Sequence, residues 1–400
     1  MFDIPPKWRW SRLSDLAIFG GGKTPSTARR EYWDNGSYLW VTSKDMKCDC
    51  INDSILKLTD EGIRDMEIYP PQTILMVVRS GILRRTLPVA ILERHATINQ
   101  DLKAISLYNN LNPWYLLFYF KALEKDILEY YQKDGTTVES IDFEKLKEVP
   151  IAIPPYPEQK RIVDSIEQWF VVIDKIEQEK KDLENAINQT KSKILDLAIH
   201  GKLVPQAPND EPAIELLRRI NPDSQPCDNA HYIMLPDGWS WCLLEDVANV
   251  LDSKRQPIKT EERKKRIQGK SITYPYYGAT GIAGDTDDYI MEGRYILLGE
   301  DGAPFLDKNA PKAYEVTGRF WVNNHAHILE PQIDFLFLLH FLNAVDYAGY
   351  VKGTTRLKLT QSDMNRIKIM LPPLSEQQLI VAKIEELFAT LDKIKESLEV

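Results

Sequence analysis

Glycine and lysine residues near the start of the chain are the first candidates for chemistry. Three glycines at 20–22 precede Lys23 and Thr24, a composition similar to that of a phosphate-binding loop. Such a loop needs a further glycine five positions before its final glycine, where this sequence has Ala17. The segment therefore predicts a flexible turn that presents the basic side chain of Lys23, not a nucleotide site.

Acidic residues gather around Gly302, where Glu300, Asp301 and Asp307 follow one another closely. Carboxylates in such a group can bind a divalent cation, but acidic residues are also common in turns. We expect an exposed loop here and no metal site. The sequence also has no Asn-Pro-Pro-aromatic or Asp-Pro-Pro-Tyr loop to hold a flipped base. It predicts no catalytic centre and no metal site in this chain.

Size and composition are those of an ordinary globular protein. The 400 residues suffice for two or three domains with a core each. The start, MFDIPPKWRW, lacks the apolar run of a signal peptide. The apolar stretches at 114–120 and 335–342 are too short to cross a bilayer, and the four cysteines form no C-x-x-C pair. We expect a cytoplasmic protein with no membrane segment.

The sequence repeats itself on the scale of a domain. PPYPEQKRIV at 154–163 returns as PPLSEQQLIV at 372–381, an offset of 218 residues. W-x-W at 8–10 returns at 239–241, an offset of 231. Weaker echoes pair 74–81 with 296–303, 98–105 with 322–329, and 114–120 with 335–341. A period of about 220 residues is too long for a solenoid, so one domain-sized unit occurs twice.

Each unit ends at the predicted start of a long helix. The paired prolines of the repeated decapeptide fix an extended approach and forbid helix upstream. Glu158 and Glu376 follow in the first turn, where the helix dipole favours a carboxylate. Ser375 and Gln378 fit a capping box at the second helix.

Both predicted helices carry an apolar seam with the spacing of a coiled coil. The seam of the first helix starts with Ile162, Ile166, Trp169, Ile173 and Ile176 and continues with Leu183, Ile187, Ile194 and Leu197. That of the second helix consists of Ile380, Ile384, Leu387, Leu391, Ile394 and Leu398. The first helix, residues 157–200, would be roughly 65 Å long. The second stops at Val400, which corresponds to Asp182. Residues 183–200 are therefore expected to lack an equal-length partner, either because the sequence is shortened or because another subunit covers them.

The predicted fold class is α+β, with two homologous mixed α/β domains separated by two long antiparallel coiled-coil helices in a pseudo-two-fold arrangement. The strand-like segments YLWVT, TILMVV and YILLG support the mixed character of the domains. The predicted parts are a first domain at 1–153, a spacer helix at 154–200, a linker at 201–233, a second domain at 234–371 and a second, apparently shortened, spacer helix at 372–400.

This duplicated order of motifs resembles the specificity subunit of type I restriction-modification enzymes over essentially the whole chain. The resemblance is carried by the W-x-W at each unit's start, PYYGATGIAG at 275–284, Gly-Thr-Thr at 135–137 and 353–355, and the I-x-(I/L)-P-P-x-x-E-Q helix starts. It implies that each globular domain is a target recognition domain. Each would bind one half of a split, asymmetric site on double-stranded DNA.

The same resemblance implies partners that carry the chemistry. The helices would space the two recognition domains and dock two methyltransferase subunits, and restriction subunits would join them to form the nuclease. No cofactor is expected in this chain. S-adenosylmethionine, ATP and magnesium are expected in the partner subunits, so the chain itself is predicted to be non-catalytic.

Basic and aromatic side chains supply the candidates for DNA contact. Arginine reads guanine in the major groove, whereas lysine mainly holds phosphate. Positions that differ between the copies are favoured for base readout, because the two domains should recognise different bases. The candidates are Lys23, Lys44, Arg79, Arg84 and Arg85 in the first copy and Lys254, Arg255, Lys264, Lys265, Arg266, Tyr276 and Tyr277 in the second. Asn99, Asn323, Asn324 and His325 are weaker candidates that would also suit structural polar groups.

Two other functions are compatible with the duplication. A scaffold could use the coiled coil to organise protein partners without binding DNA. A self-contained methyltransferase or nuclease would need a catalytic site that the sequence does not display. Steep loss of DNA binding with rising salt separates the specificity subunit from the scaffold.

Overall fold

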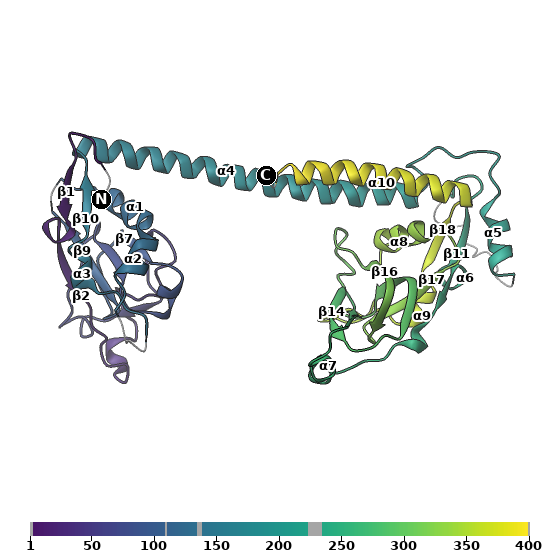
Figure 1. The fold of residues 1–400 in the computed structure, drawn as a ribbon, viewed down its shortest axis with the longest axis horizontal. Coiled ribbons are helices and arrows are strands. Elements are labelled where there is room, and N and C mark those ends of the chain that lie inside the picture. Colours follow the sequence, from purple (N-terminus) through teal and green to yellow (C-terminus); the bar gives the residue numbers. More distant parts are fainter. Residues whose placement is uncertain (1–2, 109, 134–137, 223–233, 399–400) are drawn as a thin grey trace. The chain divides into compact units, whose positions relative to one another are not determined.

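The computed structural model describes residues 3–108, 110–133, 138–222 and 234–398. These residues form two compact units, Met1–Ile176 (unit 1) and Glu177–Val400 (unit 2), which divide within the long helix α4 (Figure 1). Three predicted features lie outside the described residues: the Gly-Thr-Thr of the first copy, the end of the linker at 223–233, and Val400. No helix in the described part of the chain is long and apolar enough to cross a membrane.

Unit 1 is built mainly of short strands followed by helices. Its elements are β1 (Arg9–Arg12), η1 (Leu13–Asp15), β2 (Ala17–Gly21), η2 (Arg30–Tyr32), β3 (Tyr38–Val41), β4 (Cys50–Ile51), β5 (Leu56–Leu58), β6 (Ile74–Val77), η3 (Gly81–Arg84), β7 (Val89–Leu92), β8 (Ala96–Ile98), β9 (Leu102–Leu107), α1 (Pro113–Ala122), α2 (Glu124–Tyr130), α3 (Phe143–Leu146), β10 (Pro150–Ile153) and the first part of α4 (Tyr156–Ile199). Its strands form a five-stranded sheet of order β2-β9-β6-β7-β4, a three-stranded sheet β5-β3-β8 and the pair β1-β10.

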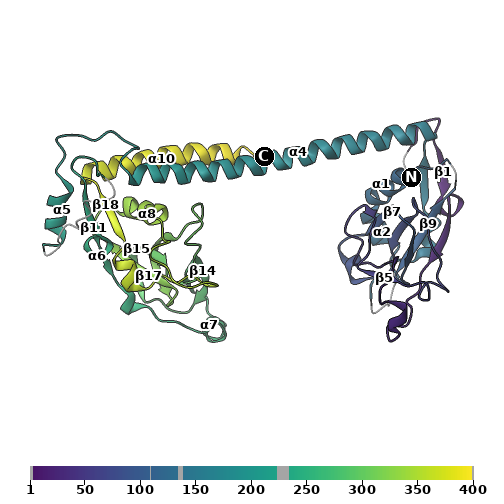
Figure 2. The same cartoon turned by 180° about the vertical axis from the view of Figure 1, so that it is seen from behind.

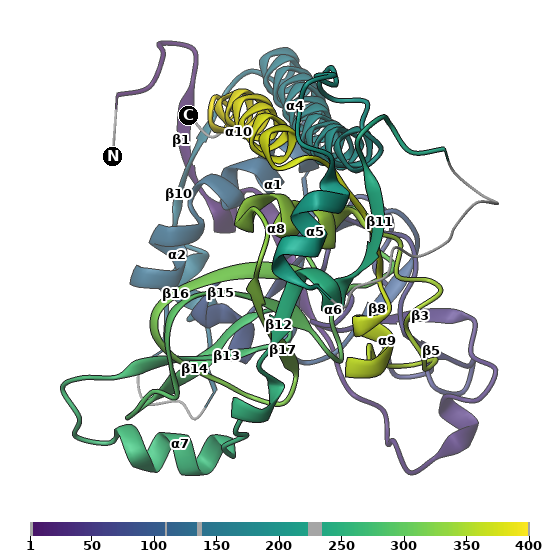
Figure 3. The same cartoon turned by 90° about the vertical axis from the view of Figure 1, so that its right-hand side faces the viewer.

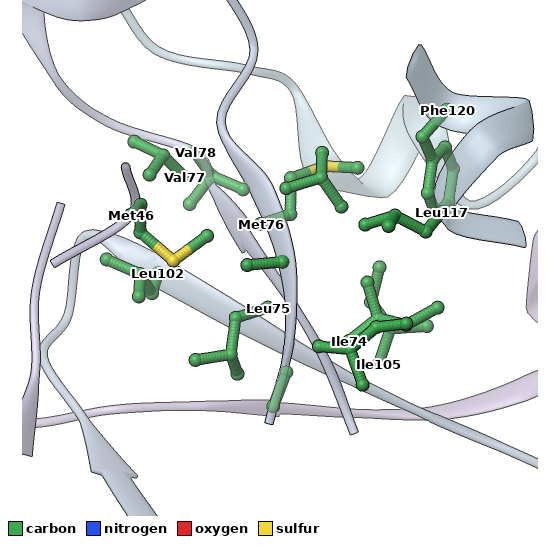
Figure 4. Packing of buried hydrophobic residues seen from close by; sticks show 14 of the residues in the cluster. Met46, Ile74, Leu75, Met76, Val77, Val78, Leu102, Ile105, Leu117 and Phe120 are labelled. Atoms are coloured by element: carbon green, nitrogen blue, oxygen red, sulfur yellow. The ribbon is translucent and has the colours of Figure 1, made fainter. Parts of the chain in front are cut away.

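The core of unit 1 lies between the five-stranded sheet and helix α1. All four residues of β6 are fully buried, as expected for a central strand with both faces covered. Leu117 and Phe120 of α1 lie beside Ile74 and Ile105 of the sheet (Figure 4).

Unit 2 repeats this plan with longer strands. Its elements after α4 are α5 (Ala213–Ile220), β11 (Ser240–Leu243), α6 (Leu244–Val247), β12 (Ala248–Val250), η4 (Asp252–Lys254), α7 (Thr260–Ile267), β13 (Tyr274–Gly278), β14 (Gly281–Thr286), β15 (Met291–Gly299), β16 (Ala313–Val322), β17 (Ala326–Pro331), α8 (Phe335–Ala344), α9 (Gln361–Asn365), β18 (Lys368–Leu371) and α10 (Leu374–Glu396). The strands form a six-stranded sheet of order β12-β17-β15-β16-β13-β14 and the pair β11-β18. Helix α8 contacts both β16 and α10, so it lies between the sheet and the long helices (Figure 3).

The sheet topology confirms the duplication. The order β2-β9-β6-β7 of unit 1 returns as β12-β17-β15-β16 in unit 2. The predicted echoes correspond to β6 with β15, β9 with β17, and α1 with α8. The units differ in what flanks this common sheet: unit 1 adds the sheet β5-β3-β8, whereas unit 2 adds the hairpin β13–β14 and helix α7.

A strand pair closes each unit in the same register. Trp10 of β1 pairs with Ala152 of β10, and Trp241 of β11 pairs with Met370 of β18. Trp10 and Trp241 differ by 231 residues, whereas Ala152 and Met370 differ by 218 residues. The two strand pairs nevertheless place these residues in equivalent positions. Differences in length between the copies are therefore absorbed inside the domains and not at their ends.

The glutamate of the repeated decapeptide bonds to the first tryptophan of W-x-W. Trp8 Nε1 donates to Glu158 Oε1 at 3.2 Å. Trp239 Nε1 donates to Glu376 Oε2 at 2.9 Å. In each unit, the first tryptophan of W-x-W therefore forms a hydrogen bond that joins the start of the unit to the start of the long helix.

The glutamine of the decapeptide joins the long helix to the main helix of its domain. Gln377 is fully buried; its side-chain nitrogen donates to the carbonyl of Pro372 at 3.0 Å, and its oxygen accepts from the backbone N–H of Asp334 at 3.0 Å. Asp334 in turn caps α8 by accepting from the N–H of Phe337. Unit 1 repeats the arrangement with Gln159, Pro154, Asn112 and α1. We call these glutamate and glutamine bonds together the Glu-Gln clasp.

Helix α10 runs antiparallel to the final part of α4 within unit 2 (Figures 1 and 2). Ile380 and Ile384, near the start of α10, share a buried cluster with Ile194 and Ala198, near the end of α4. Farther along α10, Asp392 pairs at 2.5 Å with a lysine that precedes Ile194 in α4, Lys191. The expectation that residues 183–200 lack a partner is therefore wrong, because antiparallel pairing places the start of one helix beside the end of the other.

The seam residues of the two helices have different surroundings. In α10, Leu387 and Leu391 pack against the same cluster as Ile380 and Ile384, while Ile394 is 43% exposed. In α4, Ile162 and Ile166 are half-buried. Trp169, Ile173 and Ile176 are 67%, 44% and 59% exposed. The partners that the structure gives to α10 are thus later residues of α4, which include the predicted seam residue Ile194, and not the seam residues from Ile162 to Ile176.

The predicted capping box at α10 is wrong. The helix begins at Leu374, directly after Pro373, and no side chain caps its first turn. Ser375 and Gln378 are exposed. Pro373 has extended backbone angles, as the paired prolines predict, and the buried Glu-Gln clasp fixes this helix start in place of a cap.

Replacing Gln377 by alanine is expected to destabilise unit 2 by about 2 to 4 kcal/mol, because two buried backbone groups each lose a partner. The matched control is Gln378→Ala, which changes the exposed neighbour of the same type. Urea unfolding followed by circular dichroism should show a lower midpoint for the first variant alone. Equal midpoints for both variants would contradict the structural role of the clasp.

Candidate nucleic-acid interface

Three strands of unit 1 end at one edge, around the turn at residues 98–101. The backbone N–H of Lys23 donates to a carbonyl of this turn at 3.1 Å, and that of Arg79 does so at 3.2 Å. The turn donates back to the carbonyl of Val41 at 3.0 Å, three residues before Lys44. The side chains of Lys23, Lys44 and Arg79 are exposed. The structure therefore brings three predicted cations together at one edge.

Arg84 and Arg85 lie in the connection between β6 and β7 that leaves the same edge. The short helix η3 begins there with Ser80 as its cap, whose hydroxyl accepts from the N–H of Ile82. Arg84 pairs with Glu139, but its side chain remains 69% exposed. Arg85 is also exposed. All five cations predicted for the first copy thus flank this edge of the sheet.

The three glycines before Lys23 permit close packing and do not form the predicted flexible turn. A Cβ atom at Gly20 would lie 2.1 Å from the hydroxyl of Tyr69, and one at Gly22 would lie 1.9 Å from the carbonyl oxygen of Ile98. Gly20 and Gly21 belong to β2. Lys23 is consequently presented from a fixed strand end, which reduces the entropy lost when it binds a ligand.

The equivalent edge of unit 2 is built around the turn at residues 323–325. Asn323 Oδ1 accepts from the N–H of His325 at 2.8 Å, as Asn99 Oδ1 accepts from that of Asp101 at 3.2 Å. Both asparagines are only 7% exposed. They are satisfied structural groups that shape the turn, whereas Asn324 at its tip is exposed.

Arg255 belongs to a buried ion-pair network. Its guanidinium donates to Glu300 at 2.5 Å and lies 3.1 Å from Asp252, and the three side chains are 15%, 12% and 5% exposed. His327 Nδ1 lies 2.6 Å from the Asp252 carboxylate. Burial acts to raise the pKa of Glu300, but hydrogen bonds from Arg255 and Lys358 outweigh it and lower this pKa. Arg255 is therefore a structural cation and not an available DNA contact.

This network also bears on the predicted absence of metal. Asp252, Glu300 and His327 offer ligand atoms within 4.8 Å of one another. The guanidinium of Arg255 already pairs with both carboxylates, so we assign no metal to the group. The expectation of an exposed loop at Glu300 and Asp301 is wrong, because these side chains are only 12% and 19% exposed.

Tyr276 and Tyr277 both make contacts within unit 2. Tyr276 is 3% exposed, its hydroxyl accepts from the N–H of Ile258 at 2.9 Å, and its ring lies 4.2 Å from the guanidinium of Arg263. Tyr277 packs edge-on against Phe320, and burial raises the pKa of its phenol. Tyr276 is therefore too buried to stack on a base, whereas Tyr277 is half-buried and remains a candidate.

The remaining candidates of unit 2 lie on η4 and α7. Lys254, Lys264 and Lys265 are exposed. Arg266 pairs with Glu262 one turn earlier. Helix α7 packs against β14, at the end of unit 2 away from α10 (Figure 3).

A groove that the sequence analysis missed lies at the same edge of unit 2. It has a volume of about 570 Å³ and is lined by the hairpin tip at 278–283, the Asp301-Gly302 loop, and Thr355 with Arg356. Arg356 is 61% exposed and donates to Asp301 at 2.8 Å. PYYGATGIAG and Gly-Thr-Thr thus line one groove, and the arginine that directly follows Gly-Thr-Thr was the signal available in the sequence.

Gly353 shapes this groove through its backbone. Its φ of +110° lies in the region that favours glycine, and a Cβ atom there would lie 2.5 Å from the carbonyl oxygen of Arg356. The glycine of Gly-Thr-Thr therefore allows a tight turn that directs the chain back to Asp301.

Comparison with known proteins agrees with this architecture. The family described as "Type I restriction modification DNA specificity domain" matches residues 5–185 and 236–400. The specificity subunit of the type I restriction enzyme MjaIX from Methanocaldococcus jannaschii is 25% identical over 96% of this chain and 88% of its own length. That of EcoR124I/EcoR124II from Escherichia coli is 34% identical over 42% of each chain. This match and that to a putative Haemophilus influenzae specificity subunit each span less than half of the relative's length.

Solved structures share the fold. The HsdS subunit from Thermoanaerobacter tengcongensis aligns with a TM-score of 0.55 at 15% identity, over 99% of this chain and 93% of that one. A chain from a study of assembly and conformational transition in a type I restriction-modification system aligns with a TM-score of 0.62 at 15% identity, over 100% and 94% of the two chains.

The chain belongs to the family of type I restriction modification DNA specificity domains and carries that domain twice. Specificity subunits of type I restriction enzymes are among the proteins to which this chain is similar.

Replacing Arg255 by alanine should destabilise unit 2 by about 3 kcal/mol, because two buried carboxylates lose their shared cation. Lys358 and His327 still offset part of that charge. The control is Lys254→Ala, an exposed neighbour, which should change stability by less than about 0.5 kcal/mol. Thermal unfolding measures both. A stable Arg255→Ala variant with impaired DNA binding would instead make Arg255 a DNA contact.

Proposed function

We propose that this chain is the DNA-sequence-specificity subunit of a type I restriction-modification complex, with one recognition domain for each half of a split, asymmetric site. The observation that supports this proposal most strongly is the sheet edge that both units share. Both units build it around an asparagine turn, and in both it carries exposed cations. The flanking elements differ between the units, as two readers of different sequences require.

We assign phosphate contact and base readout to different parts of this edge. The groove at Arg356 combines the glycine-rich hairpin tip with a cation, a combination that suits a phosphate oxygen. Arg356 directly follows the Gly-Thr-Thr that both copies contain, although the first copy has Val138 at the position of this arginine. Lys264 and Lys265 of unit 2 lie on α7, which has no counterpart in unit 1. Arg84 and Arg85 of unit 1 lie in the connection between β6 and β7, whose counterpart between β15 and β16 has a different sequence. We assign base readout to these regions.

Protein partners would supply the catalysis. We propose that two methyltransferase subunits dock on the long helices and that restriction subunits join this complex. S-adenosylmethionine, ATP and magnesium would bind to those partners. The support in this chain is the run of exposed apolar side chains on α4, including Trp169, Val171 and Ile176, which are 67%, 68% and 59% exposed. A scaffold that binds only proteins would share this surface but would not need the cationic edges.

Methylome sequencing tests the proposed function. A host that expresses this chain with its methyltransferase partner should methylate a motif of two specified parts separated by an unspecified gap. Arg84→Ala with Arg85→Ala should relax the sequence of one part and leave the other unchanged, because only one domain loses base contacts. Absence of any split motif, or equal changes in both parts, would contradict the proposal.

Replacing Arg356 by alanine should weaken duplex binding by about two- to tenfold and reduce the salt slope by about 1, with little change in sequence preference. The matched control is Arg366→Ala, another exposed arginine, which directly follows α9. Helix α9 contacts helix α6, and α6 directly precedes the first residue of β12. This is the end of β12 opposite to the one that leads into η4. Fluorescence anisotropy at several salt concentrations measures both variants. Failure of the unchanged protein to bind DNA at any salt would favour the scaffold.

A further inference from the structure

Unit 2 contains a cavity of about 720 Å³ beside the end of α4. Its walls come from α4, the end of α8, the strand pair β11–β18 and the segment that precedes β16. Four aromatic side chains line it: Trp241, Phe305, Phe341 and Tyr350. This size and lining are typical of a site for a small organic molecule.

Lys312 is the buried cation of this cavity. The residue is 2% exposed. Both of its backbone groups are hydrogen-bonded: the N–H donates to Asn343 Oδ1 at 2.7 Å, and the carbonyl accepts from the N–H of Gly299 at 3.0 Å. Its ammonium group forms no hydrogen bond or ion pair with the residues that the structure describes, and it is not one of their completely buried unpaired atoms, so it keeps some contact with the cavity. Burial lowers the pKa of Lys312, while Asp307 acts in the opposite direction. An unpaired buried charge is costly, and an anionic partner would relieve that cost.

The other charged groups of the cavity do not supply this partner. Asp196 is hydrogen-bonded by Lys193 at 2.6 Å, which lowers its pKa. Its carboxylate also lies 3.3 Å from His200 Nδ1. Asp346 accepts from the N–H of Ala348 at 3.0 Å. The carboxylates of the lining are thus engaged elsewhere.

We propose that this cavity binds a small anion with an aromatic body, whose carboxylate or phosphate group pairs with Lys312. The aromatic part would lie against Trp241, Phe305 and Phe341. Charge pairing at Lys312 supplies the polar anchor, and the three rings supply apolar burial. The ligand is a small molecule, so this site is separate in chemistry from recognition of duplex DNA.

The test uses the full chain and the fluorescent aromatic anion 8-anilinonaphthalene-1-sulfonate as the probe. The protein should bind one molecule of probe, and Lys312→Met should weaken this binding at least about tenfold, as expected for loss of a charged hydrogen bond. The variant should remain folded, because methionine removes a buried charge while keeping most of the side-chain volume; circular dichroism checks this. The control is Lys308→Met, an exposed lysine of the same lining, which should retain binding within about twofold.

Competition then identifies the anionic group. Displacement of the probe by adenosine monophosphate supports a phosphate ligand, and displacement by phenylacetate supports a carboxylate. Lack of displacement by either would overturn this assignment of the anion. Equal probe binding by Lys312→Met and the unchanged protein, or no binding to either, would overturn the site itself. Full displacement by duplex DNA would also overturn it and make the cavity part of the DNA surface.

Discussion

The Glu-Gln clasp is the interaction on which the architecture depends. Two strands from opposite ends of each unit pair side by side, and the next residues along the chain start a long helix. Without a further constraint, that helix could leave the domain at many angles. Gln377 removes this freedom by binding both the proline before the helix and the first turn of α8. Glu376 adds the bond to Trp239, although burial raises the pKa of this carboxyl and makes its charge costly. The same bonds recur in unit 1, so the repeated decapeptide specifies how a domain is attached to its helix.

This attachment leaves the opposite edge of each sheet available for variation. The common strands β2-β9-β6-β7 and β12-β17-β15-β16 are held by buried apolar residues and by the strand pairs. The asparagine turns are also shared, because their side chains satisfy backbone groups that any version of the edge must bury. The elements that flank the common strands differ between the units: they are a three-stranded sheet in unit 1 and a hairpin with a basic helix in unit 2. The two units thus keep the first set of contacts constant and differ in the second.

The sequence predicts the repeat, the long helix and three of the strands, β3, β6 and β15, because these depend on local pattern. The predicted helix at 157–200 differs from α4 by one residue at each end. It does not predict which seam residues meet, because antiparallel and staggered pairings satisfy the same apolar spacing. It also overestimates the basic side chains available to DNA. Arg255 and Tyr276 are residue types that can contact DNA, but only the fold shows that they already bind other groups of the protein. Arg255 pairs with buried carboxylates, and Tyr276 accepts a hydrogen bond from the backbone. The sequence does not indicate that Lys312 is buried, because the burial of a lysine depends on the residues that surround it in the fold.

The pairing of β11 with β18 has a further consequence for how such a chain can change. The first and last strands of the domain lie next to each other in antiparallel register. A segment whose two ends are adjacent can be removed and replaced through two neighbouring junctions, with little disturbance to what it is attached to. The domain thus has the layout of an exchangeable cassette, in which recombination at two short stretches would transfer a complete reading surface onto an unchanged helical frame.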